Sequence, residues 1–227
     1  MLFSIWDTRV QDYAAYAAAN PKADDSWKTQ RKDGVPVARE LDHPVVGVSW
    51  DDAQAFCRWL TEKEAAEGKL PKGAAYRLPT DEEWSIAVVL PHEEGTTPAE
   101  KNIKNIVDFP WGTDFPPKAK TANLADTAYH EKYPTDKWLT GYTDGFAMTS
   151  PVGSFPANLY GLYDMGGNVY QWCEDGWDAS QKTRVTRGAS WNITTRTTLL
   201  SSQRGNFHPG TRNNGFGFRC VLAEAAR

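Results

Sequence analysis

TDGFAMTSPVGSFPANLYGLYDMGGNVYQWCED, residues 143–175, combines Gly, Pro, Asn and Asp with aromatic side chains and has no regular periodicity until Val169–Cys173. A long irregular segment inside a compact domain needs a device that orders it. Buried tryptophans, hydrogen bonds from side chains to the backbone, and bound metal are the devices that this composition offers. The stretch therefore predicts that ordered coil, rather than long helices or a large sheet, makes up the C-terminal half of the domain.

Regular helices are predicted upstream of this stretch, within the first ninety residues. Thr8, Ser49 and Thr80 are each followed three residues later by Gln, Asp or Glu, which is the spacing of a capping box. Apolar residues then recur at helical intervals. We therefore predict helices over 8–19 and 49–68 and a third helix that begins at Thr80. Short strands are predicted at 2–6, 169–173, 184–188 and 217–222.

The charge and length of the chain limit its partners and its domain count. The 227 residues carry a formal net charge of −4 without a basic run, which argues against nucleic acid and anionic membrane surfaces as partners. No stretch reaches the ~20 apolar residues of a membrane span, and the first residues do not resemble a signal peptide. We predict one domain over 1–227 that forms part of a longer protein, because strand-like residues begin at once.

Cysteine and histidine are too sparse to indicate a metal or catalytic centre by themselves. The three cysteines, Cys57, Cys173 and Cys220, lack the spacing of a zinc site. The four histidines form no closely spaced pair of ligands, and no nucleophile elbow, zinc-protease motif or phosphate-binding glycine loop occurs. From the residues alone we predict no catalytic residue.

A resemblance to a known family organises the irregular part of the chain. The segments HPVVGVSWDDAQAFCRWL, YRLPTDEEW, FPWG, residues 143–175, and RVTRGASW through NNGFGFRC follow one another in order. Together they resemble the formylglycine-generating enzyme or sulfatase-modifying-factor domain from Asp42 to Leu222. The resemblance implies an α+β fold, an irregular variant of the C-type lectin fold with few helices, a small twisted antiparallel sheet and much ordered coil. It also implies that Cys57 and Cys220 lie close together. Cys173 has no neighbouring His or Lys in the sequence that would activate a nucleophile, so we expect it to fill core space.

The resemblance also reveals a missing catalytic feature. In formylglycine-generating enzymes, two cysteines after the RGGSW-like motif bind copper and activate oxygen, because Cu(I) selects thiolate ligands. Here the segment reads NITTRTTLLSS, with Ile193 and Thr197 or Thr198 near the cysteine positions. The histidine cluster that iron-dependent relatives need is also missing. We therefore expect no copper in this chain.

Calcium is the cofactor that the resemblance implies, since this hard cation takes carboxylate, amide and carbonyl oxygens from irregular loops. The first family site corresponds to Asn123, Leu124, Asp144 and Phe146, which match the pattern. The second corresponds to Asp164, Gly167, Val169 and Gln171, with Asp and Gln where the family most often has Asn and Glu. The alternative is that Asp144 and Asp164 only cap turns.

The segment 184–222 is the candidate ligand-binding segment. Trp191, Leu199, Phe216 and Phe218 are spaced as core anchors. The residues between them are expected to face solvent and to bind a protein or small-molecule ligand, because polar groups with a few aromatic and Arg side chains are typical of recognition loops. These residues are Asn192, Thr194, Thr195, Arg196, Thr198, Ser202, Arg204, Asn206, Phe207, His208, Thr211, Arg212, Asn213 and Asn214. The segment also resembles that of retroelement-diversified variable proteins, which vary a C-terminal segment on a fixed C-type lectin scaffold.

Three hypotheses of different classes remain open. The first is a non-catalytic ligand-binding or display domain, whose C-terminal segment is the binding surface and is diversified by a retroelement. The second is a formylglycine-generating oxidoreductase or a divergent relative. The third is a sensor or regulatory domain of a signalling protein such as a kinase. The missing cysteine pair favours the first hypothesis, whereas the sequence fixes neither the ligand nor the compartment.

Overall fold

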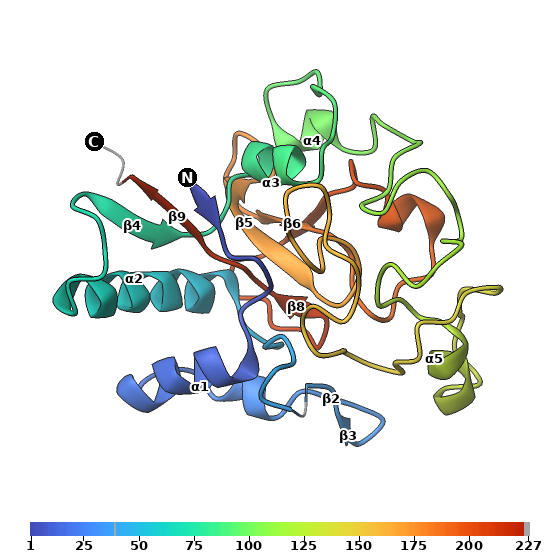
Figure 1. Ribbon diagram of the computed structural model, residues 1–227, viewed down its shortest axis with the longest axis horizontal. Coiled ribbons are helices and arrows are strands. Elements are labelled where there is room, and N and C mark those ends of the chain that lie inside the picture. The colour runs from blue at the N-terminus through green and yellow to red at the C-terminus, as the bar shows by residue number, and fades with distance from the viewer. Residues whose placement is uncertain (39, 225–227) are drawn as a thin grey trace.

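Coil connects short helices and strands in the computed structural model, which describes residues 1–38 and 40–224 (Figure 1). The two longer helices, α1 (Val10–Ala19) and α2 (Trp50–Ala66), lie next to each other. The shorter helical elements are α3 (Asp81–Ala87), α4 (Pro98–Lys101), α5 (Thr127–Lys132) and the 3₁₀ turns η1 (Ser26–Lys28) and η2 (Arg196–Leu199). Among the described residues, no helix combines the length and the apolar character that crossing a membrane requires. The α+β class with few helices and much coil is confirmed.

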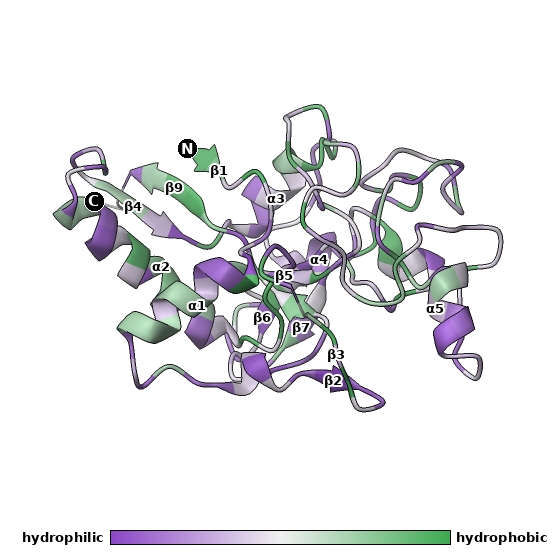
Figure 2. Cartoon of the chain, turned by 60° about the horizontal axis from the view of Figure 1, so that its bottom comes forward, coloured by the Kyte–Doolittle hydropathy of each residue, from purple (hydrophilic) through white to green (hydrophobic). Residues whose placement is uncertain are grey.

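Short strands pair into small sheets within the described residues. One antiparallel sheet has the order β1 (Leu2–Phe3), β9 (Val221–Glu224), β4 (Ala74–Arg77), and a hairpin joins β2 (Arg31–Lys32) to β3 (Val35–Pro36). A further sheet has the order β7 (Gly205–Phe207), β6 (Arg184–Arg187), β5 (Tyr170–Gly176), β8 (Phe216–Gly217). Figure 2 shows β1 and β9 as largely hydrophobic and β2 as hydrophilic.

Two details of the predicted strands are corrected. The pairing of β5 with β8 is parallel, because the long loop after β7 returns the chain to the sheet in the direction of β5. The strand predicted at 217–222 is divided into β8 and β9. These two strands belong to different sheets, so this part of the chain joins the sheets.

Side-chain caps begin α2 and α3 where the capping boxes predict them. The Ser49 hydroxyl accepts the backbone N–H of Asp52 at 3.1 Å, and the Thr80 hydroxyl accepts that of Glu83 at 3.1 Å. The carboxylates of Asp52 and Glu83 accept the N–H groups of the two cap residues in return. Each box satisfies backbone donors that the first helical turn leaves without partners.

The cap predicted at Thr8 is wrong. Arg9 is the N-cap residue of α1, and the Asp12 carboxylate accepts its backbone N–H at 3.1 Å. The backbone of Thr8 pairs with distant segments instead: its N–H donates to the Phe218 carbonyl and its own carbonyl accepts the N–H of Val45, both at 2.9 Å. Tertiary pairing of the backbone therefore moves the start of the helix.

Buried tryptophans order the coil. Trp84, Trp172 and Trp191 are fully buried, and their indole N–H groups find partners far away in the sequence. Trp172 donates to the Val48 carbonyl at 3.0 Å, and Trp191 donates to the Asn214 carbonyl at 3.1 Å. Each indole thus supplies apolar area to the core and one directional bond that fixes a loop.

A buried ionic cluster joins α3 to the sheet of β5–β8. Asp81, the first residue of α3, accepts hydrogen bonds from the guanidinium groups of Arg187 and Arg204. Arg204 also pairs with Glu93 at 2.6 Å, and Arg187 lies 4.3 Å from the centroid of the Trp84 ring. Burial alone would raise the pKa of Asp81, but the two arginines outweigh it and hold that pKa below its usual value.

The cysteines lie where they are predicted. The Sγ atoms of Cys57 and Cys220 are 3.5 Å apart, and both residues are free thiols. Cys173 is fully buried in another part of the core, and burial raises the pKa of its thiol well above the ordinary value. The two predictions, a close pair and a core cysteine, are confirmed.

Candidate functional site

Most residues of the candidate ligand-binding segment reach the surface of η2, β7 and their flanking loops. The exposed members are Thr195, Arg196, Asn206, His208, Arg212 and Asn213. The half-buried members are Asn192, Thr194, Thr198, Phe207, Thr211 and Asn214. Solvent access agrees with the prediction for these residues, whereas their binding of a ligand stays a prediction.

Ser202 and Arg204 do not face solvent, and their predicted exposure is wrong. Ser202 is fully buried and Arg204 is 2% exposed. The Ser202 hydroxyl donates to the Asn105 carbonyl, and Arg204 binds the carboxylates of Asp81 and Glu93. Buried polar groups need such partners. Because those partners are far away in the sequence, the local alternation of polar and apolar residues gives no sign of them.

The loop of residues 192–198, called the η2 loop, packs against aromatic rings from another part of the chain. The Arg196 guanidinium lies 5.2 Å from the centroid of the Phe109 ring and 5.9 Å from that of Phe115. It also donates to the Ile106 carbonyl at 3.0 Å. A cation over stacked rings is held by the ring electrons as well as by apolar contact, so this exposed arginine has a defined position.

The loop of residues 206–214, called the β7 loop, packs against the start of α2. Arg212 pairs with Asp52 at 2.9 Å and with Asp24 at 3.3 Å. By contrast, the exposed amide of Asn206 makes no hydrogen bond within the described residues. The loop thus carries both an anchored cation and a free polar group.

The residues just before the η2 loop contact the end of the β7 loop. Trp191 donates its indole N–H to the Asn214 carbonyl, and Ser190 donates its hydroxyl to the Asn192 side-chain oxygen at 2.8 Å. A Cβ on Gly215 would lie 2.9 Å from the Ser190 hydroxyl, so the Ser190 side chain packs closely against the backbone there. We call the η2 loop and the β7 loop together the C-terminal face.

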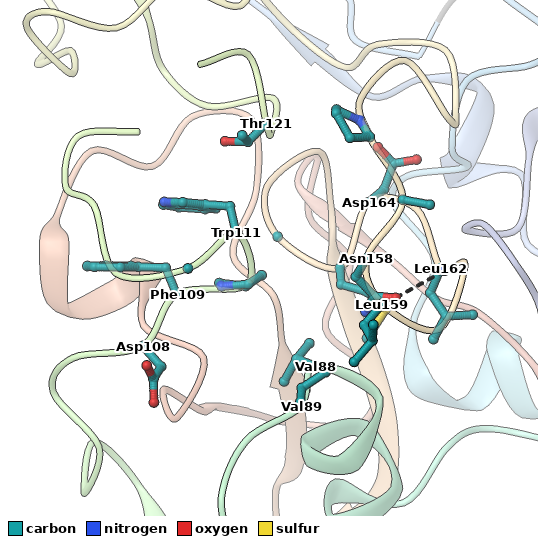
Figure 3. A pocket seen from close by; sticks show the side chains of 16 residues that line it. Val88, Val89, Asp108, Phe109, Trp111, Thr121, Asn158, Leu159, Leu162 and Asp164 are labelled. Atoms are coloured by element: carbon teal, nitrogen blue, oxygen red, sulfur yellow. Dashed lines mark hydrogen bonds between the residues drawn. The ribbon is translucent and has the colours of Figure 1, made fainter. Parts of the chain in front are cut away.

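A cavity of about 410 Å³ opens near the aromatic rings that Arg196 covers (Figure 3). The ring of Trp111, which lines it, stacks on Phe109 with centroids 5.2 Å apart and an angle of 6°. Apolar residues of the opposite wall, Leu159 among them, and the Asp164 side chain complete the lining. Burial raises the pKa of Asp164. No member of the C-terminal face lines this cavity, so it is a separate feature.

The η2 loop holds no thiol that could bind copper. Ile193 packs against the main hydrophobic core, and Thr198 is half-buried. The cysteines of the chain are buried elsewhere, and the hydrogen bond with Cys220, together with burial, raises the pKa of Cys57. A thiolate is the form that binds metal and attacks electrophiles, so these cysteines are poorly suited to either task.

The first predicted calcium set comes together around Asp144. The Asp144 carboxylate accepts the backbone N–H groups of Leu124 and Phe146, each at 2.8 Å. Burial raises the pKa of Asp144 to about 7, against the effect of those two bonds. The side-chain oxygen of Asn123 is buried without a hydrogen-bond partner. A desolvated carboxylate, with an unpartnered amide oxygen on the residue before Leu124, fits the donor chemistry of calcium.

Two neighbours of Asp144 were missed by the sequence interpretation. The Asp126 carboxylate accepts the N–H of Asp144 at 2.6 Å and that of Gly145 at 3.0 Å, and Lys120 donates to the Asp144 carbonyl at 3.1 Å. Asp126 lies in the TANLAD segment, but no pattern links it to Asp144. In residues 1–38 and 40–224, no three His, Cys, Asp or Glu side chains group as a metal site, so amide and carbonyl oxygens would complete any calcium site.

In the second predicted calcium set, the side chains of Gln171 and Asp164 accept hydrogen bonds from N–H groups of the protein. The Gln171 side-chain oxygen accepts the Trp84 indole N–H at 2.8 Å and the Arg219 Nε–H at 2.9 Å. The Asp164 carboxylate accepts the N–H of Gly153 at 2.8 Å. Gly167 and Val169 lie on the turn between Asp164 and Gln171. Because Gln171 directs its oxygen at two N–H donors, this set does not fit a calcium ion.

Comparison with known proteins places the chain in a family. Residues 5–224 match the sulfatase-modifying factor enzyme 1-like domain. The chain is 36% identical over 203 residues to the inactive C-alpha-formylglycine-generating enzyme 2 of Bos taurus, which covers 86% of this chain and 55% of that protein. It is 32% identical over 196 residues to the serine/threonine-protein kinase pkn1 of Chlamydia caviae, covering 79% of this chain and 24% of the kinase.

A solved structure shares the fold. The variable protein 1 of Treponema denticola superposes with a TM-score of 0.61 at 20% identity, covering 96% of this chain and 82% of that chain. This likeness concerns the fold alone. The chain spans about half the length of the bovine relative, so the functions of complete relatives do not transfer to it directly.

Proposed function

The chain belongs to the family of the sulfatase-modifying factor enzyme 1-like domain, and we propose that it is a ligand-binding member without oxidase activity, with the C-terminal face as its binding surface. The observation that carries the proposal is the η2 loop, where Ile193 and Thr197 or Thr198 stand near the positions of the copper-binding cysteines. The bovine relative is itself named inactive, which supports the same conclusion for this chain.

The composition and anchoring of the C-terminal face support binding. Its Arg196 and Arg212 are held by aromatic rings and carboxylates, whereas the side chains of Thr195, Asn206 and Thr211 make no hydrogen bonds within the described residues. Pre-positioned cations beside free polar groups reduce the entropy that binding would cost and leave hydrogen-bonding capacity for a ligand. Such a surface suits recognition better than proton transfer.

An oxygen-uptake assay tests the absence of oxidase activity. The chain, loaded with copper, is mixed with a cysteine-bearing sulfatase peptide, and a formylglycine-generating enzyme serves as the positive control. We expect no uptake above the rate of free copper, because no thiolate pair is available in the η2 loop. Peptide-dependent uptake by this chain would overturn this half of the proposal.

Selection of binders tests the surface. Random peptides displayed on phage are selected on the wild-type chain, and the Kd of each is measured for wild type and for the triple variant T195A/N206A/T211A. We expect at least a ten-fold weaker Kd in the triple variant, which is about 1.4 kcal/mol. The control is K72A, an exposed change in the turn between α2 and β4. Peptides that bind both variants as well as wild type would contradict the proposed surface.

Diversification of segment 184–222 is the finer part of the proposal. If a retroelement varies the segment, sibling sequences should differ at exposed positions such as Asn206 and Asn213 but keep Ser202 and Arg204, whose partners are in the core. Sequencing the segment in many sibling clones tests this expectation. Uniform segments would remove the diversification hypothesis and leave the binding function intact.

Calcium at the first set, around Asn123 and Asp144, is proposed as a structural ion of this domain. The unpartnered Asn123 oxygen and the buried Asp144 carboxylate support it. When bound, the ion would supply positive charge between loops that otherwise bury an uncompensated carboxylate. Calcium titration of the wild-type chain and of an Asp144 variant tests this role.

A second candidate function is a sensor domain within a signalling protein. The similarity to the chlamydial kinase, which extends over 24% of that protein, favours it. Sequencing the complete reading frame tests this candidate directly, because a kinase domain in the same frame would support it and its absence would contradict it. Both candidates use the C-terminal face for binding and differ only in what is attached to the domain.

A further inference from the structure

We infer that the guanidinium of Arg219 takes the place of the second calcium ion that the family resemblance implies. A positive charge of the chain itself then holds the turn at Asp164 and strand β5 together, and the domain binds no ion there. The inference does not depend on the proposed ligand-binding function or on calcium at the first set.

The side chain of Gln171 already has hydrogen-bond partners within the protein. Its side-chain oxygen accepts one hydrogen bond from Trp84 and one from Arg219, and its amide N–H donates to the Asp164 carbonyl at 2.8 Å. The residue is fully buried, so these bonds satisfy a group that has no access to water. A metal ligated by Gln171 would have to displace both donors.

Oxygens from several residues surround the Arg219 guanidinium. Besides Gln171 it contacts the backbone carbonyls of Ser4 at 3.2 Å, Tyr163 at 2.7 Å and Asp164 at 3.4 Å. It also pairs with the Asp7 carboxylate at 3.1 Å. Arg219 and Asp7 are fully buried, so the guanidinium is hydrogen-bonded to protein oxygens inside the core.

The Arg219 guanidinium connects segments that are far apart in the sequence. Ser4 and Asp7 lie between β1 and α1, Tyr163 lies in the turn before β5, and Arg219 itself lies between β8 and β9. A calcium ion orders irregular loops in the same way, by gathering oxygens from separate segments around one positive charge. Here a side chain from the C-terminal strand region does so.

Calcium and the guanidinium cannot share the Gln171 oxygen. A calcium ion would need that oxygen at about 2.3–2.6 Å, whereas the Arg219 Nε–H already donates to it at 2.9 Å. A calcium ion and a guanidinium held by one oxygen inside a protein would also repel each other strongly. The fixed guanidinium therefore excludes the ion.

Calorimetric titration of CaCl₂ into the chelator-treated wild-type chain tests the inference. We expect at most one calcium per chain, and no calcium bound by D144N, which removes the carboxylate of the first set. A stoichiometry of two, or calcium still bound by D144N, would overturn the inference. A stoichiometry of zero would support it and refute calcium at the first set, so the two proposals fail separately.

Two variants test whether the guanidinium itself is responsible. Both variants carry D144N, so that calcium at the first set does not contribute. In D144N/Q171E/R219M the guanidinium is removed and the family's glutamate is restored, so calcium at about 100 times its Kd should raise the Tm by about 5 °C. The matched control, D144N/Q171E, keeps Arg219 and should show no rise, because the new carboxylate pairs with the guanidinium. A rise in D144N/Q171E, or none in a folded D144N/Q171E/R219M, would overturn the inference. If the triple variant does not fold, the D144N/Q171E variant and the wild-type titration decide.

Discussion

Two buried aspartates of this protein have opposite electrostatic surroundings. Asp81 lies between the guanidinium groups of Arg187 and Arg204, which hold its pKa below the usual value although burial opposes them. Asp144 accepts two backbone N–H groups, and burial raises its pKa to about 7. Both are nearly inaccessible to solvent, so the difference comes from the neighbours and not from the degree of burial.

An added cation would stabilise the fold at Asp144 but not at Asp81. At Asp81 the chain supplies its own positive charges, and another cation would be repelled. At Asp144 the nearby Lys120 donates to the backbone carbonyl and not to the carboxylate, which leaves the negative charge to be met by a proton or a metal ion. The Asp81 cluster is therefore self-sufficient, whereas the Asp144 site is responsive to its surroundings.

The largest expected effect is the loss of the charge at Asp81. D81N leaves two buried guanidinium groups with one counter-charge fewer, and removing one partner of a buried ion pair costs about 3–5 kcal/mol. Urea unfolding at neutral pH measures the change in free energy of unfolding. The control is E82Q, the exposed neighbour on α3. Equal midpoints for the two variants would mean that the cluster contributes little.

Features that depend on nearby residues could be predicted from the sequence, whereas buried charges with distant partners could not. The caps at Ser49 and Thr80 depend on residues three positions apart, so a local pattern predicts them. The position of the cysteine pair followed from the family resemblance. Arg204 and Arg219 could not be recognised as core residues, because their carboxylate partners Asp81 and Asp7 lie far away in the sequence. Burial of a charge depends on such distant compensation, which periodicity does not encode.

The next effect in size is the response of the Asp144 site to calcium. An ion that binds only the native chain stabilises it by about 2.7 kcal/mol at 100 times its Kd. We expect calcium to raise the Tm of wild type and of D114N, an exposed aspartate in another loop, but not of D144N. Thermal unfolding with calcium and with chelator measures this. A wild-type Tm unaffected by chelation would show that Asp144 is not a calcium ligand.

A smaller effect is expected at Glu93, at the edge of the Asp81 cluster. Burial would raise the pKa of Glu93, but the hydrogen bond and charge of Arg204 lower it. A carboxylate with a lowered folded-state pKa stabilises the fold above its unfolded pKa, and this stabilisation is lost as the pH falls through the folded pKa. E93Q should therefore be less stable than wild type by about 1.5 kcal/mol at pH 7. The difference should shrink progressively below about pH 4.5. Urea unfolding between pH 7 and 3 measures it, and a constant difference would exclude the ionic contribution.

The smallest effect is expected where the charges are exposed. Hydrogen bonds from Lys63 and Lys69 lower the pKa of Glu67 to about 2, yet all three side chains are open to water. Solvent screens such pairs, and ordering the long side chains offsets their attraction. We expect E67Q to unfold at the same urea midpoint as wild type, whatever the salt concentration. A clear loss of stability in E67Q would mean that a lowered pKa stabilises this fold even at an exposed site. The different behaviour of Asp81 and Asp144 could then not be explained by whether a buried carboxylate has a compensating positive charge.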